Sequence, residues 1–253
     1  MFLSPKNLRL LFLLCICTSI PFSCEHEYLE CSNCSDSFLK KDTKVSILGD
    51  SYSTFQGYLY PSDNLTYYPN QITGVSNVSQ TWWYQFITNN QLILEYNNSY
   101  GGSTIAQKSN NKRTSFVKRY LNLGNPELIF IFGGTNDSWQ KIPLGNYKYE
   151  SWEEEDLQDF RPAFAYLLSQ IQQIYPNAKI VNLINTDLHK DYKTSMEVIC
   201  QYYHICNISL GDFEKKDNHP SKKGMESICQ QITQILVKQT DYHNINNSKT
   251  VSK

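Results

Sequence analysis

The sequence KVSILGDS, residues 44–51, decides the fold prediction, because a short apolar run passes directly into a Gly-Asp-Ser turn. If this run is a strand of a parallel sheet, it delivers Ser51 to the carboxyl edge, where such sheets bind ligands. Gly49 permits a tight exit, and a helix starting there would offer backbone N–H donors. Because Gly, Asp and Ser are also ordinary turn residues, the interpretation needs support from the rest of the chain.

Similar apolar segments recur along the chain with helical patterns between them. The predicted strands are 45–48, 92–96, 128–132, 180–184 and, more weakly, 205–209. The predicted helices are 80–88, 156–175, 193–203 and 221–237. This alternation predicts an α/β protein with a parallel sheet covered by helices on both faces.

The composition favours one catalytic domain. The chain has 253 residues, 40% hydrophobic and 19% charged, which is enough apolar material for a sizeable core. Its net charge is -1, with 23 basic and 24 acidic residues, so it lacks the basic surface that nucleic acids require. We therefore expect no binding to nucleic acid. A monomer is expected as well, although composition does not determine the oligomeric state.

The N-terminus has the pattern of an export signal. Lys6 and Arg9 precede an apolar run at 10–20, and the small residue Ser23 stands directly before Cys24. This predicts a signal peptide at 1–23, a polar leader at 24–43, a folded domain at 44–240 and a polar tail at 241–253. We expect a secreted, periplasmic or cell-surface protein. Cys24 is a candidate lipoprotein anchor, the one expected membrane attachment, although Pro21 stands where an aliphatic residue is normal.

Two of the eight cysteines lie in the predicted signal, and export permits disulfides among the other six. Cys31 and Cys34 have a CxxC spacing, which we interpret as a disulfide or nothing, because no second pair or histidine cluster completes a metal site. Cys200 and Cys206 could close a small loop between a helix and the next strand. The sequence leaves the pairing open and predicts no metal.

Three further segments carry polar groups that could act together with Ser51. NNSYGGST (97–104) and GGTND (133–137) follow predicted strands, and DNHP (217–220) precedes the last helix. At one edge of a sheet they would combine a serine hydroxyl, backbone N–H donors, an amide and an imidazole. A serine hydroxyl becomes nucleophilic when an imidazole takes its proton, and the resulting tetrahedral anion needs preplaced donors. The four segments together predict a serine hydrolase.

In order and content these segments resemble the four blocks of the SGNH (GDSL-like) hydrolase family, over residues 44–237. The resemblance implies a flavodoxin-like three-layer α/β/α sandwich with a central, mostly parallel five-stranded sheet. It implies Ser51 as nucleophile and His219 as general base. It also implies Gly102 and Asn136 as oxyanion donors beside the Ser51 N–H, and it implies no cofactor.

The acidic member of the triad departs from the family pattern. The family usually has it three residues before the histidine, where this chain has Lys216. Asp217 is our candidate, because residues two apart in an extended segment point to the same side. Asp212, Glu214 and a Ser-His dyad oriented by a backbone carbonyl are alternatives, since the third group fixes the tautomer and orientation of His219.

Other polar and aromatic residues have competing interpretations. Asn136 also begins a glycosylation sequon, but a glycan would exclude the oxyanion role, which the joint pattern favours. Asp50 is expected to bond the turn backbone rather than act in catalysis. The ring of Trp139 could line the cleft and stack on a sugar or cover an acyl chain, or it could have no such role. At least one of Trp82 and Trp83 should face the core.

We therefore predict an exported serine esterase that forms an acyl-enzyme at Ser51 and removes an acyl group, expected to be acetyl, from a carbohydrate. Export, the 13% aromatic content and the family resemblance motivate this substrate. The alternatives are a lipase or lysophospholipase, an acyltransferase, and a noncatalytic carbohydrate-binding protein on the same fold.

Overall fold

The computed structural model describes Cys34, residues 39–107 and residues 114–250, with side chains in the last helix as far as Leu236. The predicted signal peptide and the predictions for Cys24 and Cys31 lie outside these residues. Within the described residues, no helix combines the length and the apolar character needed to cross a bilayer.

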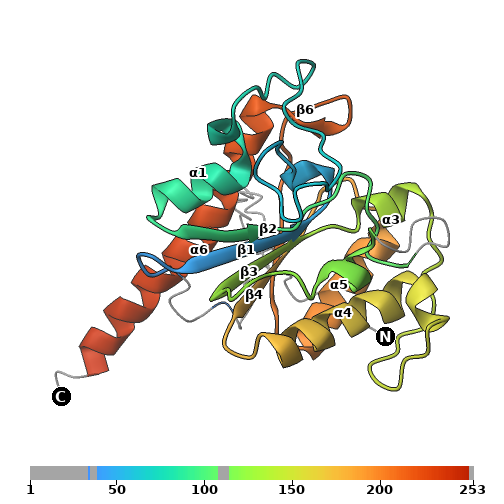
Figure 1. The fold of residues 1–253 in the computed structure, drawn as a ribbon. Coiled ribbons are helices and arrows are strands. Elements are labelled where there is room, and N and C mark those ends of the chain that lie inside the picture. The colour runs from blue at the N-terminus through green and yellow to red at the C-terminus, as the bar shows by residue number, and fades with distance from the viewer. Residues whose placement is uncertain (1–33, 35–38, 108–113, 251–253) are drawn as a thin grey trace, which may run out of the picture. The chain divides into compact units, whose positions relative to one another are not determined.

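A five-stranded sheet, parallel throughout, lies at the centre of the domain (Figure 1). Its strands are β1 (Lys44–Gly49), β2 (Ile93–Asn97), β3 (Leu128–Phe132), β4 (Lys179–Ile184) and β5 (Cys206–Ser209). Their spatial order is β2-β1-β3-β4-β5, the flavodoxin-like order, so the predicted fold is confirmed. The order reverses at β1 and β3, and their carboxyl ends form the switch point where such sheets bind ligands.

Helices cover both faces of the sheet (Figure 1). Because successive side chains of a strand point to opposite faces, β3 contributes Leu128, Phe130 and Phe132 to one core and Ile129 and Ile131 to the other. The first core contains side chains of α1 (Trp82–Asn89) and α6 (Lys222–Thr250). The second contains side chains of α2 (Phe116–Arg119), α4 (Phe160–Ile174) and α5 (Lys190–Tyr202).

Three features of the helices and turns differ from the sequence prediction. The α6 helix continues to Thr250 through most of the predicted polar tail, because no glycine or proline follows Gly224 to end it. Two helices, α2 and α3 (Thr135–Trp139), are too short to show a periodic pattern. A small antiparallel hairpin of β6 (Lys215–Lys216) and β7 (His219–Pro220) carries the fourth sequence block.

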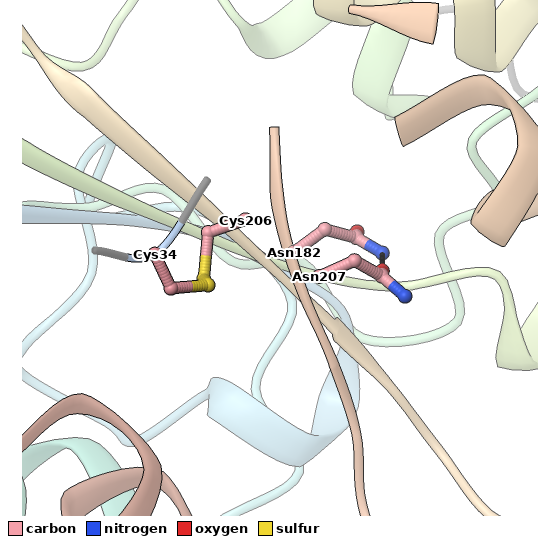
Figure 2. The surroundings of a disulfide bond; sticks show 4 residues. All are labelled: Cys34, Asn182, Cys206 and Asn207. Carbon is pink, nitrogen blue, oxygen red and sulfur yellow. Dashed lines mark hydrogen bonds between the residues drawn. A yellow bond between two sulfur atoms is a disulfide. The ribbon is translucent and has the colours of Figure 1, made fainter. Parts of the chain in front are cut away.

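Cys34 and Cys206 form a disulfide, which differs from both candidate pairings that the sequence offered (Figure 2). Cys34 does not pair with Cys31, and Cys206 does not pair with Cys200. The physical reason is the alternation of β5: Cys206 points into the core that also contains Cys34, whereas Cys200 belongs to the core on the opposite face. Asn207, the next residue of β5, instead accepts a hydrogen bond from Asn182 of β4 at 2.7 Å.

Candidate active site

The turn after β1 presents Ser51. Ser51 begins η2 (Ser51–Ser53), a single 3-10 turn, and its side chain is largely buried. The Asp50 carboxylate caps this turn by accepting a hydrogen bond from the Tyr52 N–H at 3.0 Å, which agrees with its predicted structural role. Burial raises the pKa of Asp50 to about 7. Asp50 therefore fixes the backbone that carries Ser51.

Gly49 and the buried Arg119 hold the backbone around this turn in different ways, the glycine by allowing close packing and the arginine by donating hydrogen bonds. A Cβ on Gly49 would lie 2.6 Å from Ser99 Oγ, so a larger residue would displace the loop after β2. Arg119 donates hydrogen bonds to the Gly49 carbonyl at 3.0 Å and to Ser103 Oγ at 2.9 Å, and also to the Asn98 carbonyl. Its guanidinium thus ties the ends of β1 and β2 to the loop that follows.

Ser51 and His219 are brought together although 168 residues separate them. His219 Nε2 lies 3.0 Å from Ser51 Oγ, within hydrogen-bond distance. The other ring nitrogen, Nδ1, lies 2.7 Å from the main-chain carbonyl oxygen of Asp217. A carbonyl oxygen can only accept, so Nδ1 carries the proton of the neutral ring and Nε2 is left to accept the Ser51 proton.

The carboxylate of Asp217 is not the group that contacts the imidazole, contrary to the predicted geometry. The segment is not extended: Asp217 and Asn218 have φ values of 51° and 57°, the pattern of a type I′ two-residue hairpin loop. This turn directs the Asp217 carbonyl to His219, while the carboxylate accepts a hydrogen bond from Tyr67 at 3.2 Å. Glu214 accepts a hydrogen bond from Ser221 instead. The geometry matches the carbonyl-oriented dyad considered from the sequence.

Three aromatic side chains surround the imidazole of His219. Tyr67 stacks on it with ring centroids 3.6 Å apart and an interplanar angle of 8°. The ring centroids of Tyr52 and Trp139 lie 5.4 and 6.5 Å from that of His219. Burial lowers the pKa of His219 below 6.5, and the Asp217 carbonyl and charge oppose this only in part. The ring is therefore neutral at neutral pH and available as a base.

Of the two predicted oxyanion donors, Asn136 lies in α3 and Gly102 lies in the loop after β2. The side-chain amide of Asn136, in the first turn of α3, donates to the Ser103 carbonyl at 2.9 Å and has a second N–H for another acceptor. Gly102, adjacent to Ser103, is exposed and has φ 77°, and a Cβ on it would meet no atom within 4 Å. The same loop is held by Asp137, whose carboxylate accepts hydrogen bonds from the N–H groups of Ile105 and Ala106.

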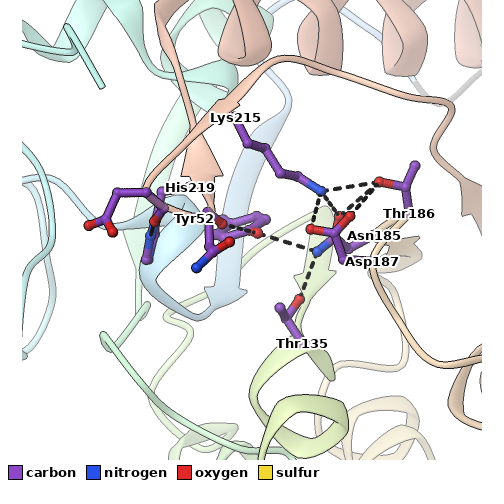
Figure 3. A network of polar contacts seen from close by, with 9 residues as sticks. Tyr52, Thr135, Asn185, Thr186, Asp187, Lys215 and His219 are labelled. Atoms are coloured by element: carbon purple, nitrogen blue, oxygen red, sulfur yellow. Dashed lines mark hydrogen bonds and ion pairs between the residues drawn. The ribbon is translucent and has the colours of Figure 1, made fainter. Parts of the chain in front are cut away.

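A polar network ties the hairpin to the end of β4 (Figure 3). Lys215 forms an ion pair with Asp187 at 2.5 Å and donates to Asn185 Oδ1 at 3.0 Å. Asn185 Nδ2 in turn lies 3.4 Å from the Tyr52 hydroxyl and donates to Thr135 Oγ1 at 3.2 Å. Lys215, two residues from the loop that orients His219, is thereby connected to the turn of Ser51.

Sequence reasoning missed Tyr67, Arg119 and the Lys215 network, because none belongs to a motif and each acts through contacts distant in sequence. Trp82 and Trp83 are both in the core, as expected for at least one of them, and Trp139 is 42% exposed beside His219. The described residues contain no group of three or more His, Cys, Asp or Glu side chains that could hold a metal ion.

A hydrogen-bonded serine and histidine at the switch point of a flavodoxin-like sheet is the arrangement of a serine-dependent ester hydrolase. A family model described as GDSL-like lipase/acylhydrolase matches residues 43–236, so the chain belongs to this family of ester-bond hydrolases. The predicted family and enzyme class are confirmed. Comparison with curated proteins gives no match.

Solved structures agree with this assignment. A protein from Bacteroides uniformis ATCC 8492, described as a GDSL-like lipase, is 46% identical with a TM-score of 0.74, covering 76% of this chain and 94% of that chain. A similarly described protein from Bacteroides ovatus ATCC 8483 is 46% identical with a TM-score of 0.75, covering 79% and 100%. An acetyl xylan esterase from Butyrivibrio proteoclasticus shares the fold alone, at 17% identity and a TM-score of 0.54, covering 80% and 66%.

Proposed function

We propose that this hydrolase is an esterase that removes a small acyl group, acetyl in the first instance, from a carbohydrate through an acyl-enzyme at Ser51. The observation that carries the mechanism is the 3.0 Å contact between Ser51 Oγ and His219 Nε2, with Nδ1 bonded to a carbonyl that fixes the reactive tautomer.

The proposed reaction has two balanced steps. Ser51 Oγ attacks the ester carbonyl carbon while its proton passes to His219 Nε2. The tetrahedral intermediate breaks the bond to the alcohol, which leaves with that proton. Water then attacks the acyl-enzyme, gives a proton to His219, and releases the acid as the proton returns to Ser51. The Ser51 N–H, the Gly102 N–H and the Asn136 amide are the proposed donors to the developing oxyanion.

Aromatic side chains beside the base support a sugar as the alcohol part. Trp139 is 42% exposed with its ring edge-to-face to His219, and Tyr67 is half-buried against the same imidazole. Exposed aromatic rings provide flat apolar surfaces that suit the apolar faces of sugar rings. The alcohol leaves next to the base that protonates it, so these rings are where a sugar would lie.

A longer acyl chain is the second candidate, favoured by Leu65. Its main-chain carbonyl accepts a hydrogen bond from the Gly101 N–H at 2.8 Å, and its side chain is 57% exposed beside the proposed oxyanion loop. An exposed leucine there could contact an acyl chain, as in a lipase or lysophospholipase. An acyltransferase would use the same acyl-enzyme with an alcohol in place of water.

Export is part of the proposal. A disulfide persists in oxidising compartments, so the Cys34–Cys206 bond supports a secreted, periplasmic or cell-surface location for the folded domain. Attachment through Cys24 and a monomeric state are likewise proposed from the sequence.

The test is hydrolysis of p-nitrophenyl acetate, butyrate and octanoate, followed by acetylated oligosaccharides, with the mature wild-type protein. Ser51→Ala is the inactive variant, and Ser79→Ala, which changes an exposed serine, is the matched control. We expect Ser51-dependent release that is fastest from acetate. A preference for octanoate would move the assignment to lipids, and Ser51-independent release would contradict the mechanism. Binding of a glycan without any release would favour the noncatalytic alternative.

A further inference from the structure

Three tyrosines from one segment of the chain hold the hairpin that carries His219. Each hydroxyl donates to a different residue of the loop or of β7. The bonds are Tyr67 to the Asp217 carboxylate at 3.2 Å, Tyr52 to the Asn218 carbonyl at 2.6 Å, and Tyr68 to the Pro220 carbonyl at 2.8 Å. The hairpin has only two residues in each strand, so these contacts supply order that its own ladder cannot.

Of the three, Tyr67 is the one whose ring lies face-to-face on the imidazole. The 3.6 Å centroid separation and 8° angle describe close parallel contact over the ring of His219. Burial and the Asp217 carboxylate raise the pKa of Tyr67 to about 12, so its hydroxyl stays protonated and remains a donor. Tyr68 and Tyr67 pack edge-to-face with ring centroids 4.9 Å apart, a contact that restricts the plane of the stacked ring.

We propose that Tyr67 is a positioning residue for His219: its stacked ring, packed against Tyr68, sets the plane of the imidazole, which a carboxylate orients in a Ser-His-Asp triad. This inference rests on the proposed function of His219 as the base.

The single hydrogen bond between His219 Nδ1 and the Asp217 carbonyl leaves part of the orientation of the ring free. One hydrogen bond to Nδ1 selects the tautomer, but the ring can still tilt about that contact and move Nε2 away from Ser51. A parallel ring at van der Waals distance opposes that tilt, because tilting drives the imidazole edge into Tyr67. The Asp217 carboxylate thus acts on the tyrosine, and the Asp217 carbonyl acts on the histidine.

The same stack shields the imidazole from water. The polar and charged groups about His219 are the hydroxyls of Ser51 and Tyr52 from the η2 turn, Tyr67, and Asp217, whose charge raises the pKa of His219. Burial is the main cause of the lowered pKa of His219, and Tyr67 supplies one face of that burial. Removing the Tyr67 ring should therefore raise the pKa of His219 toward its ordinary value, because the charged imidazole would be better hydrated.

Two substitutions separate the ring from the hydroxyl. Tyr67→Phe keeps the stack and loses the bond to Asp217, whereas Tyr67→Leu keeps an apolar side chain but removes the ring that covers the imidazole face. Tyr202→Leu is the matched control, because Tyr202 also stacks on a tyrosine, Tyr149 at 3.9 Å, but lies at the end of α5 remote from His219. Circular dichroism spectra compare the folding of all four proteins.

The first readout is kinetic. We expect Tyr67→Leu to lower kcat for p-nitrophenyl acetate by about 10- to 100-fold with KM changed less, because a misplaced base slows chemistry more than binding. Tyr67→Phe should lose less activity than Tyr67→Leu, because its ring keeps the stack, and Tyr202→Leu should match wild type. A Tyr67→Leu enzyme with wild-type kcat, or a Tyr67→Phe enzyme as slow as Tyr67→Leu, would overturn the proposal.

The second readout needs no substrate. NMR titration of the folded protein with labelled histidine follows the His219 ring, assigned by the signal lost in His219→Gln. We expect its pKa to lie below 6.5 in wild type and Tyr67→Phe and to rise in Tyr67→Leu. An unchanged titration in Tyr67→Leu contradicts the positioning role. Failure of the proposed function would appear separately, as wild-type protein without Ser51-dependent release while the titration still responds to Tyr67.

Discussion

The main-chain carbonyl of Asp217 lies 2.7 Å from Nδ1 of His219, while the carboxylate of the same residue faces Tyr67. One residue thus contributes to the site through two different groups, and the positive φ of the hairpin loop separates them. A lysine at the position three before the histidine is compatible with this geometry, because the carbonyl supplies the acceptor that fixes the tautomer.

The acid limb of the pH profile should reflect His219. Because burial lowers its pKa below 6.5, the ring stays neutral and able to accept a proton until the pH falls below that lowered value. We expect kcat/KM to be constant above it and to fall about tenfold per pH unit below it. Measurement of kcat/KM for p-nitrophenyl acetate across the acid range tests this, with Tyr202→Leu as control. A midpoint at or above 6.5 would argue against a buried neutral base.

Replacing Asp217 by asparagine should have little effect on catalysis. The substitution keeps the main-chain carbonyl, suits a positive φ, and retains a side-chain oxygen for the Tyr67 hydroxyl. We expect kcat within about 3-fold of wild type, whereas loss of an orienting carboxylate in a triad costs about 10⁴-fold. Steady-state kinetics decide between the two. A loss approaching the larger figure would restore the carboxylate as the acidic triad member.

Asn136→Ala should lower kcat by about 100- to 1000-fold, the usual effect of removing one oxyanion donor. The variant also loses the hydrogen bond to the Ser103 carbonyl, so its thermal stability must be measured alongside. Asn177→Ala, at an exposed turn position, is the matched control. Equal activity of the two variants would remove Asn136 from the mechanism.

The Cys34–Cys206 disulfide should contribute stability without affecting catalysis. It links residues 172 apart, and native disulfides typically contribute about 2 to 5 kcal/mol. We expect the double variant Cys34→Ser, Cys206→Ser to unfold at lower denaturant concentration and to keep wild-type kcat, because Cys206 begins β5 at the edge opposite the site. A reducing agent should destabilise wild type and leave the double variant unchanged. Equal sensitivity of both to reductant would refute the assignment.

Much of the fold and part of the site were predictable because their signals are local. Apolar runs of strand length at β1 and β3, each followed by a glycine-containing turn, identify a parallel sheet and its functional edge. Ser51 stands in such a turn and His219 in the DNHP block before the last helix, so each was recognisable as a candidate, and their joint pattern indicated that they meet. The residue types of the four blocks determine the chemistry available.

Tertiary structure alone decided how the base is oriented and which cysteines pair. The orientation depends on the φ of Asp217 and on Tyr67, 150 residues away, and neither leaves a periodic or motif signal. The pairing of Cys34 with Cys206 depends on which face of the sheet each side chain reaches. A sequence specifies local turns and apolar faces directly, whereas the partner of a side chain is fixed only when distant segments pack together.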